Sequence, residues 1–324
     1  MTKSSNIILN NILLTGGAGY IGSHISVYLI KQGFNVTIFD SFINSRHFVL
    51  EKIKYLIKIQ NSKNLKNLEI VEGDIRDLNS LRKLFDRSKQ NKKPFYAVIH
   101  LAGLKQVANS VNKPLEYWEN NVFGSINLLK VMDENNCRTI IFSSSATIYE
   151  KSSAANIKES FSINPSNPYG STKAAVEKIL MDVFESRPNQ WGIINLRYFN
   201  PIGADPSGLL GEQPKNNPSN IFPIILDVAS NKSKQLNIYG NDWETDDGTA
   251  VRDYIHISDL SNGHIKALEF LKNNKPQYLN LNLGTGIGTS VLELIKTFEN
   301  SNKVEVPYVY AKRRLGDVSY AVAD

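Results

Sequence analysis

A glycine-rich turn near the start of the chain constrains its fold more than any other feature. Residues 12–15 are apolar or small and read as a buried strand, and glycines follow at positions 16, 19 and 22. Apolar residues then recur at helical spacing until Gly33. Glycines placed in this way allow a tight turn, a close approach of the backbone to an anionic group and close packing of helix on strand. The segment therefore predicts the first strand–turn–helix unit of an α/β sheet.

The alternation of strand and helix continues through the first half of the chain. Further strands are expected at residues 36–39, 68–71, 97–101, 138–142 and 192–196, and long helices at 117–132 and 169–184. This alternation predicts a parallel sheet covered by helices on both faces, a doubly wound Rossmann fold. After about Asn200, prolines and glycines indicate a long irregular stretch, and shorter elements follow it. We expect a smaller second domain there.

The composition of the 324 residues is that of a soluble globular protein, with 41% hydrophobic and 21% charged residues. Cys137 is the only cysteine, which excludes an internal disulfide and fits a reducing compartment. No segment approaches the roughly 20 apolar residues of a membrane span, and the N-terminus lacks a signal-peptide core, so we expect a cytoplasmic protein. The net charge is +6, but the basic residues are scattered and do not predict nucleic-acid binding.

Acidic residues follow the second and third expected strands. Asp40 lies 18 residues after Gly22, where a carboxylate accepts hydrogen bonds from an adenosine ribose and repels a 2′-phosphate; the pattern favours NAD over NADP. Asp74 can accept a hydrogen bond from the adenine amino group. The alternatives are an ordinary strand-end acid for Asp40 and a loop cap for Asp74. The sequence has no Walker A and no G-x-S-x-G motif, which argues against nucleotide hydrolysis and serine hydrolysis.

Tyr169 and Lys173 lie four residues apart on an expected helix, and Ser145 lies 24 residues before Tyr169. Residues four apart face the same side of a helix, and a nearby ammonium lowers the pKa of a tyrosine from about 10. A partly ionised phenol can take a proton from a sugar hydroxyl near neutral pH. The three side chains are therefore the candidate catalytic residues. The alternative for Ser145 is a hydroxyl that only ends a core strand, and the same spacing at Tyr308 and Lys312 is interpreted as coincidence.

Eight sequence blocks, which together span nearly the whole chain, carry a family resemblance. They occupy residues 15–24, 71–76, 100–105, 113–117, 142–147, 196–201, 248–256 and 313–317. In these blocks the chain resembles the extended short-chain dehydrogenase/reductase family, and within it the sugar-nucleotide 4-epimerases. The resemblance implies a NAD-binding Rossmann domain at residues 1–198 and a UDP-sugar-binding domain at residues 199–324, with some segments returning to the first. The family usually has further helices beyond the position of Asp324, so we expect a truncated C-terminus.

The resemblance also implies a role for each matching residue. The residues expected to bind NAD are Gly16, Gly19, Tyr20, Ile21, Gly22, Asp40, Asn44, Ser45, Asp74, Ile75, Leu101, Ala102, Gly103, Lys105, Asn121, Ser145, Tyr169, Lys173 and Phe199. Those expected to bind the UDP-sugar are Ser145, Tyr169, Asn200, Asn220, Ile221, Tyr239, Arg252, Arg314, Asp317 and Ala321. The histidines lack metal-site spacing, so no metal is expected. In the family, helices like 115–132 and 169–184 pair across a homodimer, which we expect here.

Two arginines suit a diphosphate, because a guanidinium group binds two oxygens at once. The alternative is that Arg252 or Arg314 only pairs with Asp253 or Asp317. Ala321 matches a position that walls the sugar pocket in the epimerases. A small residue there leaves room for an N-acetyl group, which predicts activity on UDP-N-acetylglucosamine.

The reaction implied by the resemblance interconverts UDP-galactose and UDP-glucose through transient oxidation at C4. Related 4,6-dehydratases carry Asp and Glu directly after the catalytic hydroxyl, where this chain has Ala146 and Thr147. Neither residue can remove a proton from C5 or protonate a leaving hydroxyl, so an epimerase is favoured over a lyase. A dehydrogenase, an epimerase of another sugar and a non-catalytic NAD-binding protein remain as alternatives. Ser41 and Glu150 depart from the family pattern, which has Asn and Gly there.

Overall fold

A seven-stranded parallel sheet forms the larger part of the molecule. The computed structural model describes residues 10–150, 156–215, 218–314 and 317–324. The strands lie in the order β10-β6-β5-β4-β1-β2-β3. Their bounds are β1 (Asn11–Thr15), β2 (Asn35–Asp40), β3 (Leu68–Glu72), β4 (Ala97–His100), β5 (Thr139–Ser145), β6 (Gly192–Tyr198) and β10 (Tyr278–Leu283). The strand order reverses between β1 and β4, as in a doubly wound Rossmann sheet, so the predicted fold class is confirmed.

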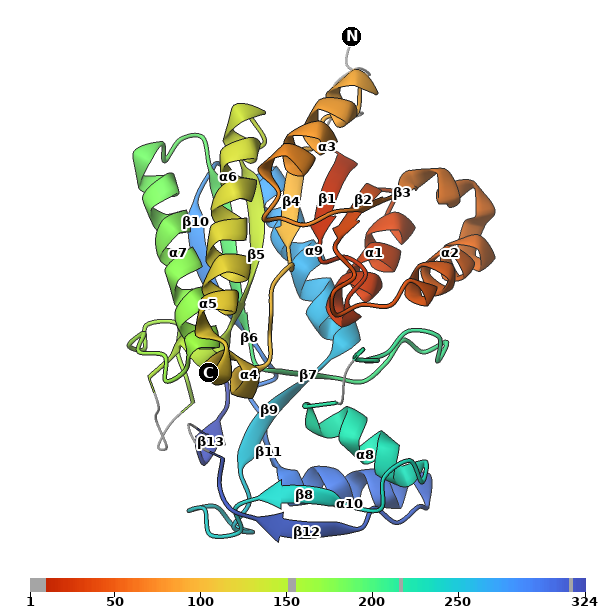
Figure 1. The fold of residues 1–324 in the computed structure, drawn as a ribbon, viewed down its shortest axis with the longest axis vertical. Coiled ribbons are helices and arrows are strands. Elements are labelled where there is room, and N and C mark those ends of the chain that lie inside the picture. The colour runs from red at the N-terminus through yellow and green to blue at the C-terminus, as the bar shows by residue number, and fades with distance from the viewer. Residues whose placement is uncertain (1–9, 151–155, 216–217, 315–316) are drawn as a thin grey trace.

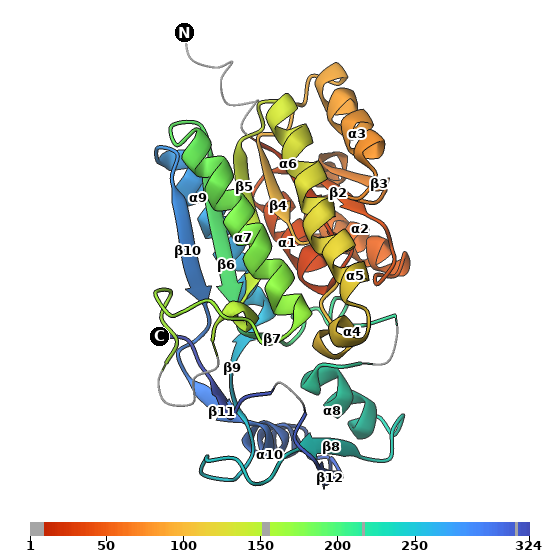
Figure 2. The same cartoon turned by 60° about the vertical axis from the view of Figure 1, so that its left-hand side comes forward.

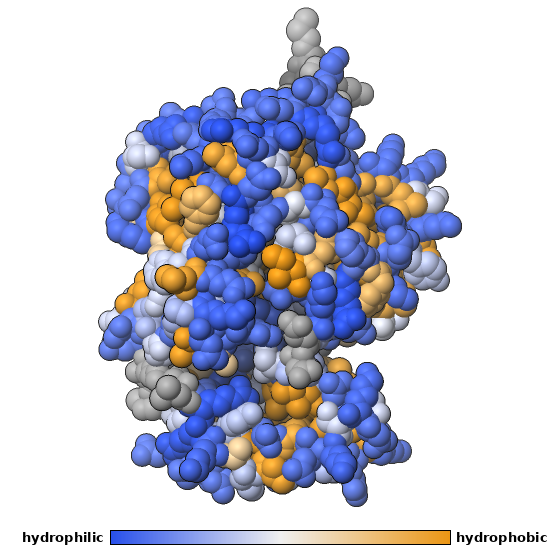
Figure 3. Space-filling model, in the orientation of Figure 1, coloured by the Kyte–Doolittle hydropathy of each residue, from blue (hydrophilic) through white to orange (hydrophobic). Residues whose placement is uncertain are grey.

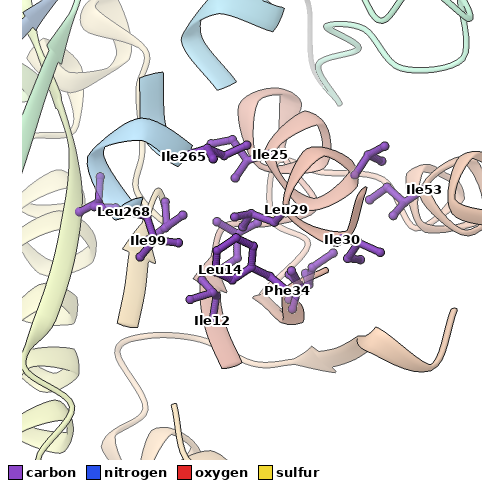
Figure 4. Close-up of a cluster of buried hydrophobic side chains, with 14 of the residues drawn as sticks. Ile12, Leu14, Ile25, Leu29, Ile30, Phe34, Ile53, Ile99, Ile265 and Leu268 are labelled. Carbon is purple, nitrogen blue, oxygen red and sulfur yellow. The ribbon is translucent and has the colours of Figure 1, made fainter. Parts of the chain in front are cut away.

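Helices cover both faces of this sheet (Figures 1 and 2). One face packs against α1 (Tyr20–Lys31), α2 (Phe48–Asn61) and α9 (Ile257–Asn273), and the other against α3 (Leu78–Gln90), α6 (Gly124–Glu134) and α7 (Pro168–Ser186). Successive residues of β1 alternate between the two cores, because strand side chains point to opposite faces. Figure 4 shows Ile12 and Leu14 in the first core, with Ile265 of α9 beside α1, whereas Leu13 belongs to the second core.

A smaller part lies beyond the carboxyl ends of the strands, toward which the arrows of β6 and β10 point in Figure 2. It contains β7 (Asn200–Ile202), β8 (Leu236–Tyr239), β9 (Val251–His256), β11 (Gly288–Ser290), β12 (Tyr308–Ala311), β13 (Tyr320–Ala321), α8 (Ile221–Ala229) and α10 (Val291–Asn302). Apolar side chains of α8, β8 and α10 form its own core. This part therefore packs as a unit and faces the end of the sheet where ligands bind in such folds.

The chain leaves the smaller part and returns to the sheet. Helix α9 and strand β10 follow β9, and β10 pairs with β6 at the edge of the large sheet. The division at residue 198 stays a prediction, and the structure places α9 and β10 of the later segment with the sheet. The remaining short elements are η2 (Ser62–Asn67), α4 (Val107–Asn112), α5 (Pro114–Tyr117), η3 (Trp118–Phe123) and η4 (Ala146–Ile148).

Polar side chains cover most of the face seen in Figure 3, and apolar ones gather in patches over the α6–α7 side and near α8. Across the part of the chain that the structure describes, no helix combines the length and the apolar character that a bilayer crossing requires.

Candidate active site

The glycine-rich turn joins β1 to α1 at the point where the strand order reverses. Gly16 has a φ of +71°, and a Cβ there would lie 2.7 Å from the backbone N of Ala102, in the loop after β4. A Cβ on Gly22 would lie 2.5 Å from the carbonyl O of Gly16. A side chain is therefore excluded at positions 16 and 22, and the first backbone N–H groups of α1 stay open to an anion. This cradle fits the pyrophosphate of a dinucleotide.

Asp40 ends β2 beside this turn and is buried. Its Oδ2 accepts a hydrogen bond from the N of Ala18 (2.9 Å), and its Oδ1 accepts from the N of Phe42 and the Oγ of Ser45, both at 2.8 Å. A carboxylate has about four acceptor positions, so these bonds leave one for a ribose hydroxyl. Asn44, in the same loop, is exposed.

Asp74 follows β3 and makes a bidentate ion pair with Arg76, with Oδ2 at 2.7 Å from Nη2. Burial opposes ionisation of Asp74, but the hydrogen bonds from Arg76 outweigh it and hold the pKa of the carboxyl below its usual range. Its Oδ1 also accepts from the backbone N of Arg76 at 2.8 Å, as in the loop cap that was the alternative for this residue, and adenine binding stays a prediction. Ile75 is buried against Gly124 of α6, where a Cβ would lie 2.6 Å from its Cδ1.

Asn121 holds the loop that follows β4. Its Oδ1 accepts from the N of Leu104 (2.7 Å), and its Nδ2 donates to the O of Leu104 and to the Oγ1 of Thr172, both at 3.0 Å. It lies in η3, a wider π-helical turn, and such turns occur often at functional sites. A Cβ on Gly103 would lie 3.1 Å from Asn121 Oδ1 and 3.8 Å from the Nζ of Lys173. The loop, η3 and α7 therefore meet in one place.

Tyr169, Lys173 and Ser145 are all buried at that place. Asn167 caps α7, accepting from the N of Gly170 at 2.9 Å, and Tyr169 lies in the first turn. Ser145 ends β5, and its hydroxyl interacts with the phenol of Tyr169. The Nζ of Lys173 lies 5.9 Å from the Tyr169 ring centroid and donates to the O of Ser143 (2.7 Å). The structure thus brings the three candidate catalytic side chains together.

The sequence-based prediction that Lys173 lowers the pKa of Tyr169 is wrong for this geometry. Burial raises the pKa of the Tyr169 phenol, and its interaction with Ser145 offsets only part of that effect. Burial also lowers the pKa of Lys173 to about 8, although the nearby carboxylate of Glu177 opposes the change. The sequence pattern predicted the four-residue spacing of Tyr169 and Lys173, but it did not predict that both side chains are buried.

A buried histidine is connected to the same loop through hydrogen bonds to Ser125 and Asn121. His100 ends β4, with Nδ1 at 2.7 Å from Thr15 Oγ1 and Nε2 at 2.8 Å from Ser125 Oγ. Burial, together with the charge of Lys173, lowers the pKa of His100 to about 3, so the ring is neutral. Ser125 in turn donates to the O of Asn121 at 2.5 Å. His100 is thus a structural residue of the sheet, as its strand position predicts.

Five of the predicted UDP-sugar residues form two groups in the smaller part. Arg252 on β9 donates to Asp317 and to the O of Val318 (2.9 Å), and Ala321 on β13 pairs with Arg252 in the ladder. The guanidinium carbon of Arg314 lies 3.9 Å from the ring centroid of Tyr239. The Arg252–Asp317 ion pair was the alternative to a diphosphate contact, and the structure contains it.

Four more predicted site residues lie where the sheet and the smaller part meet, namely Phe199, Asn200, Asn220 and Ile221. Phe199 is buried and packs with Ile148 and Ala323, and Asn200 follows it on β7. Asn220 precedes α8 and donates from Nδ2 to Glu212 Oε1 at 2.7 Å, while Ile221 packs on the core of the smaller part.

Sequence reasoning missed two carboxylates that lie beside predicted site residues, Glu177 near Lys173 and Glu212 beside Lys105 and Asn220. Glu177 lies one turn after Lys173 on α7, a spacing that continues the four-residue repeat of Tyr169 and Lys173 and could have identified it. Glu212 lies in the irregular stretch before Asn220, where no periodic pattern points to it.

Comparison with known proteins gives a consistent result. A model of the NAD dependent epimerase/dehydratase family matches residues 12–284. A bifunctional UDP-glucose 4-epimerase and UDP-xylose 4-epimerase from Pisum sativum is 45% identical over 96% of this chain and 87% of its own length. A UDP-glucose 4-epimerase from Bacillus subtilis is 44% identical over 97% and 88%.

Among solved structures, that of UDP-glucose 4-epimerase from Bifidobacterium longum in complex with NAD+ and UDP superposes with a TM-score of 0.89. It is 41% identical, and the match covers 97% of this chain and 90% of that one. The family model and the relatives both cover far more than half of the sequence, together with the glycine-rich turn and the Tyr169–Lys173 pair. The chain therefore belongs to the NAD-dependent epimerase/dehydratase family.

Proposed function

We propose that this chain interconverts UDP-galactose and UDP-glucose by epimerisation at C4, with NAD as a bound cofactor. The observation that carries the proposal is the joint burial of Tyr169, Ser145 and Lys173 beside the loop after β4. The names of the relatives from Pisum sativum and Bacillus subtilis support the same reaction. UDP-N-acetylglucosamine is proposed as a second substrate because Ala321 is small.

NAD would lie across the switch point of the sheet, with its pyrophosphate on the glycine-rich turn and its adenosine ribose at Asp40. The loop after β4, fixed by Asn121, would flank its other end, near Lys173. When bound, NAD would supply a hydride acceptor for C4 of the sugar, a hydride donor for the return to the opposite face, and a positive charge close to Tyr169.

Tyr169 would take the proton of the 4-hydroxyl group, directly or through Ser145, and give it back at the end of the reaction. Burial raises the pKa of the phenol, so it needs a nearby cation to ionise near neutral pH. Lys173, whose own pKa burial lowers to about 8, does not lower the pKa of the phenol in this geometry, so bound NAD would have to supply that charge. The buried geometry also keeps water away from the keto sugar.

Arg252, Arg314 and Asp317 would anchor the UDP end, with Tyr239 beside Arg314. Anchoring at one end leaves the sugar free to turn, so both faces of C4 can meet the cofactor. Arg252 would exchange part of its contact with Asp317 for diphosphate oxygens, which a guanidinium fork binds bidentately.

Elimination is disfavoured by the residues after Ser145. Ala146 has no acid–base group, and the Oγ1 of Thr147 donates to Ser145 Oγ at 3.0 Å. A 4,6-dehydratase needs carboxyl groups at these two places, so the keto sugar has no route to lose its 6-hydroxyl. The residues therefore support an epimerase over a lyase.

The test is incubation of purified protein with UDP-galactose, without added NAD, followed by NMR of the anomeric protons. Appearance of UDP-glucose establishes 4-epimerisation with a resident cofactor. No conversion, even after NAD is added, contradicts the proposal. The same assay with UDP-N-acetylglucosamine tests the second substrate.

We further propose that the protein is a cytoplasmic homodimer that pairs through the surface of α4, α5 and η3. Large apolar side chains are exposed there, with Leu115 at 82%. The exposed residues are Val107, Val111, Leu115, Trp118 and Phe123. Light scattering that gives a monomer mass at micromolar concentration would contradict this.

A further inference from the structure

The irregular segment 203–215, with Asn220 farther along the chain, links the two parts of the molecule. The hydroxyl of Tyr20 at the start of α1 donates to the O of Gly203 at 2.7 Å. Farther along, Arg46 donates to the O of Lys215 (3.3 Å), and Lys215 donates from Nζ to the O of Phe42 (3.3 Å). The segment therefore contacts the start of α1 and the loop after β2, which flank the proposed dinucleotide site.

Glu212 lies in the middle of this segment and joins two predicted ligand contacts. Its Oε1 accepts from Lys105 Nζ at 2.6 Å and from Asn220 Nδ2 at 2.7 Å. Lys105 comes from the loop after β4 and is expected to bind the cofactor, whereas Asn220 precedes α8 and is expected to bind the UDP-sugar. The side chain of Glu212 is only 10% exposed, against 52% for Lys105.

The burial of Glu212 separates it from ordinary surface pairs. A largely buried carboxylate needs donors, because an unpaired buried charge is costly. Both donors converge on one oxygen, so a movement of either one changes the field and the geometry felt by the other. The bond from Lys105 joins two charged groups and is therefore strong, and the bond from the Asn220 amide depends on its orientation. A shift of either donor therefore changes the position of the carboxylate relative to the other.

We propose that Glu212 is a positioning residue that couples cofactor binding to UDP-sugar binding. When the UDP-sugar holds Asn220 in place, Glu212 orients Lys105 toward the cofactor. When the cofactor holds Lys105 in place, Glu212 orients Asn220 toward the UDP-sugar. Binding of UDP then tightens the binding of NAD, and NAD tightens the binding of UDP by the same factor, because coupling between two sites is reciprocal. The inference rests on the proposed function only in the identity of the two ligands.

The test measures the dissociation constant of UDP for protein loaded with NAD and for protein stripped of NAD. We expect about 10-fold tighter binding to the loaded wild-type protein, within the usual range of coupling between sites. Glu212→Ala should bring this ratio to about 1, and Glu212→Gln should leave an intermediate ratio, because its amide oxygen still accepts from Asn220. Glu269→Gln, which breaks an exposed pair with Lys266 on α9, is the control and should keep the wild-type ratio.

A second measurement separates coupling from a purely structural role. If Glu212 only stabilises the segment, Glu212→Gln lowers the unfolding midpoint but leaves the UDP ratio at the wild-type value, and the proposal is overturned. In the supporting outcome, Lys105→Ala and Asn220→Ala have non-additive effects on UDP affinity in the wild-type background and additive effects in Glu212→Ala.

The two proposals fail in different ways. Affinities for UDP and NAD are measured without turnover, so a ratio that depends on Glu212 supports the coupling even if UDP-galactose is not epimerised. An active epimerase whose ratio is the same in wild type and in Glu212→Gln keeps the proposed function and refutes the coupling.

Discussion

The guanidinium of Arg197 and the carboxylate of Glu177 form a buried bidentate ion pair behind α7. Nη2 lies 2.6 Å from Oε2 and Nε 3.0 Å from Oε1, with side-chain exposures of 2% and 4%. The Oγ of Ser144 donates to the same carboxylate at 2.5 Å, and Arg197 also donates to the hydroxyl of Tyr149 at 3.0 Å. The pair thus joins the helix that carries Tyr169 and Lys173 to β5 and β6.

We expect Glu177→Gln to lower the free energy of unfolding by about 3–5 kcal/mol, because it leaves the buried Arg197 charge unpaired. Urea unfolding followed by circular dichroism measures this. Glu269→Gln removes an exposed partner of Lys266 and should cost less than about 1 kcal/mol. Equal losses in the two variants would contradict the argument.

The pH dependence of stability should report on Lys173. Burial lowers its pKa to about 8, whereas an unfolded lysine titrates near about 10.4. Between these pH values the unfolded chain binds more protons at this position, so the contribution of Lys173 to stability rises with pH. The unfolding free energy of wild type minus that of Lys173→Met should increase by about 2 kcal/mol from pH 8 to pH 10. A difference that does not change with pH would show that Lys173 keeps an ordinary pKa.

Tyr169→Phe should lower kcat by roughly 10²–10⁴-fold, the usual loss on removing a general base. The ring still fills its place beside Leu104 and Tyr117, so the fold should persist. The affinity for UDP should change by less than about 2-fold, because UDP lacks the hexose whose 4-hydroxyl group the phenol would contact. NMR assays of samples quenched at fixed times measure kcat, and calorimetry measures the affinity for UDP. Retention of near wild-type kcat would assign the proton transfer to another group.

Asp40→Asn should weaken NAD binding by roughly 10–100-fold, because a hydrogen bond to a charged acceptor contributes about 1.5–3 kcal/mol. It should also narrow the preference for NAD over NADP, since the negative charge that repels a 2′-phosphate is gone. Fluorescence titration with both cofactors gives the ratio. An unchanged ratio would mean that Asp40 only accepts from Ala18, Phe42 and Ser45.

Ala321→Tyr should remove activity on UDP-N-acetylglucosamine while keeping most activity on UDP-galactose. The structure places Ala321 opposite Arg252, whereas the hydroxyl of Tyr320 donates to Asn156 at 2.8 Å. An added aromatic ring would take the volume of the acetyl group, so we expect a loss of about 100-fold in kcat/KM for the larger substrate only. Comparable losses for both substrates, or a wild-type protein inactive on every N-acetyl sugar, would contradict this.

The sheet and its ligand-binding edge followed from local patterns. Asp40 was expected at the end of a strand, and it is the last residue of β2. The strand predicted at residues 138–142 extends three residues farther, to Ser145. Buried parallel strands are short apolar runs and the turn after β1 requires glycines, so neighbouring residues alone carry this information.

The contacts of charged side chains did not follow from such patterns. Glu177 and Glu212 are ordinary helix and loop residues in the sequence, and their roles depend on Arg197, Lys105 and Asn220, which lie far along the chain. The direction of the pKa of Tyr169 was missed for a similar reason, since burial is set by tertiary packing rather than by the residue four positions away.

The return of α9 and β10 to the sheet has a consequence for how the chain folds. During synthesis β6 emerges long before β10, so its outer edge and the apolar faces that later pack on Ile265 and Leu268 stay uncovered while the smaller part is made. An uncovered strand edge invites wrong pairing, and pairing between distant segments is slow. The nucleotide-binding half is therefore not an early, self-sufficient folding unit; its completion waits for the segment that follows β9.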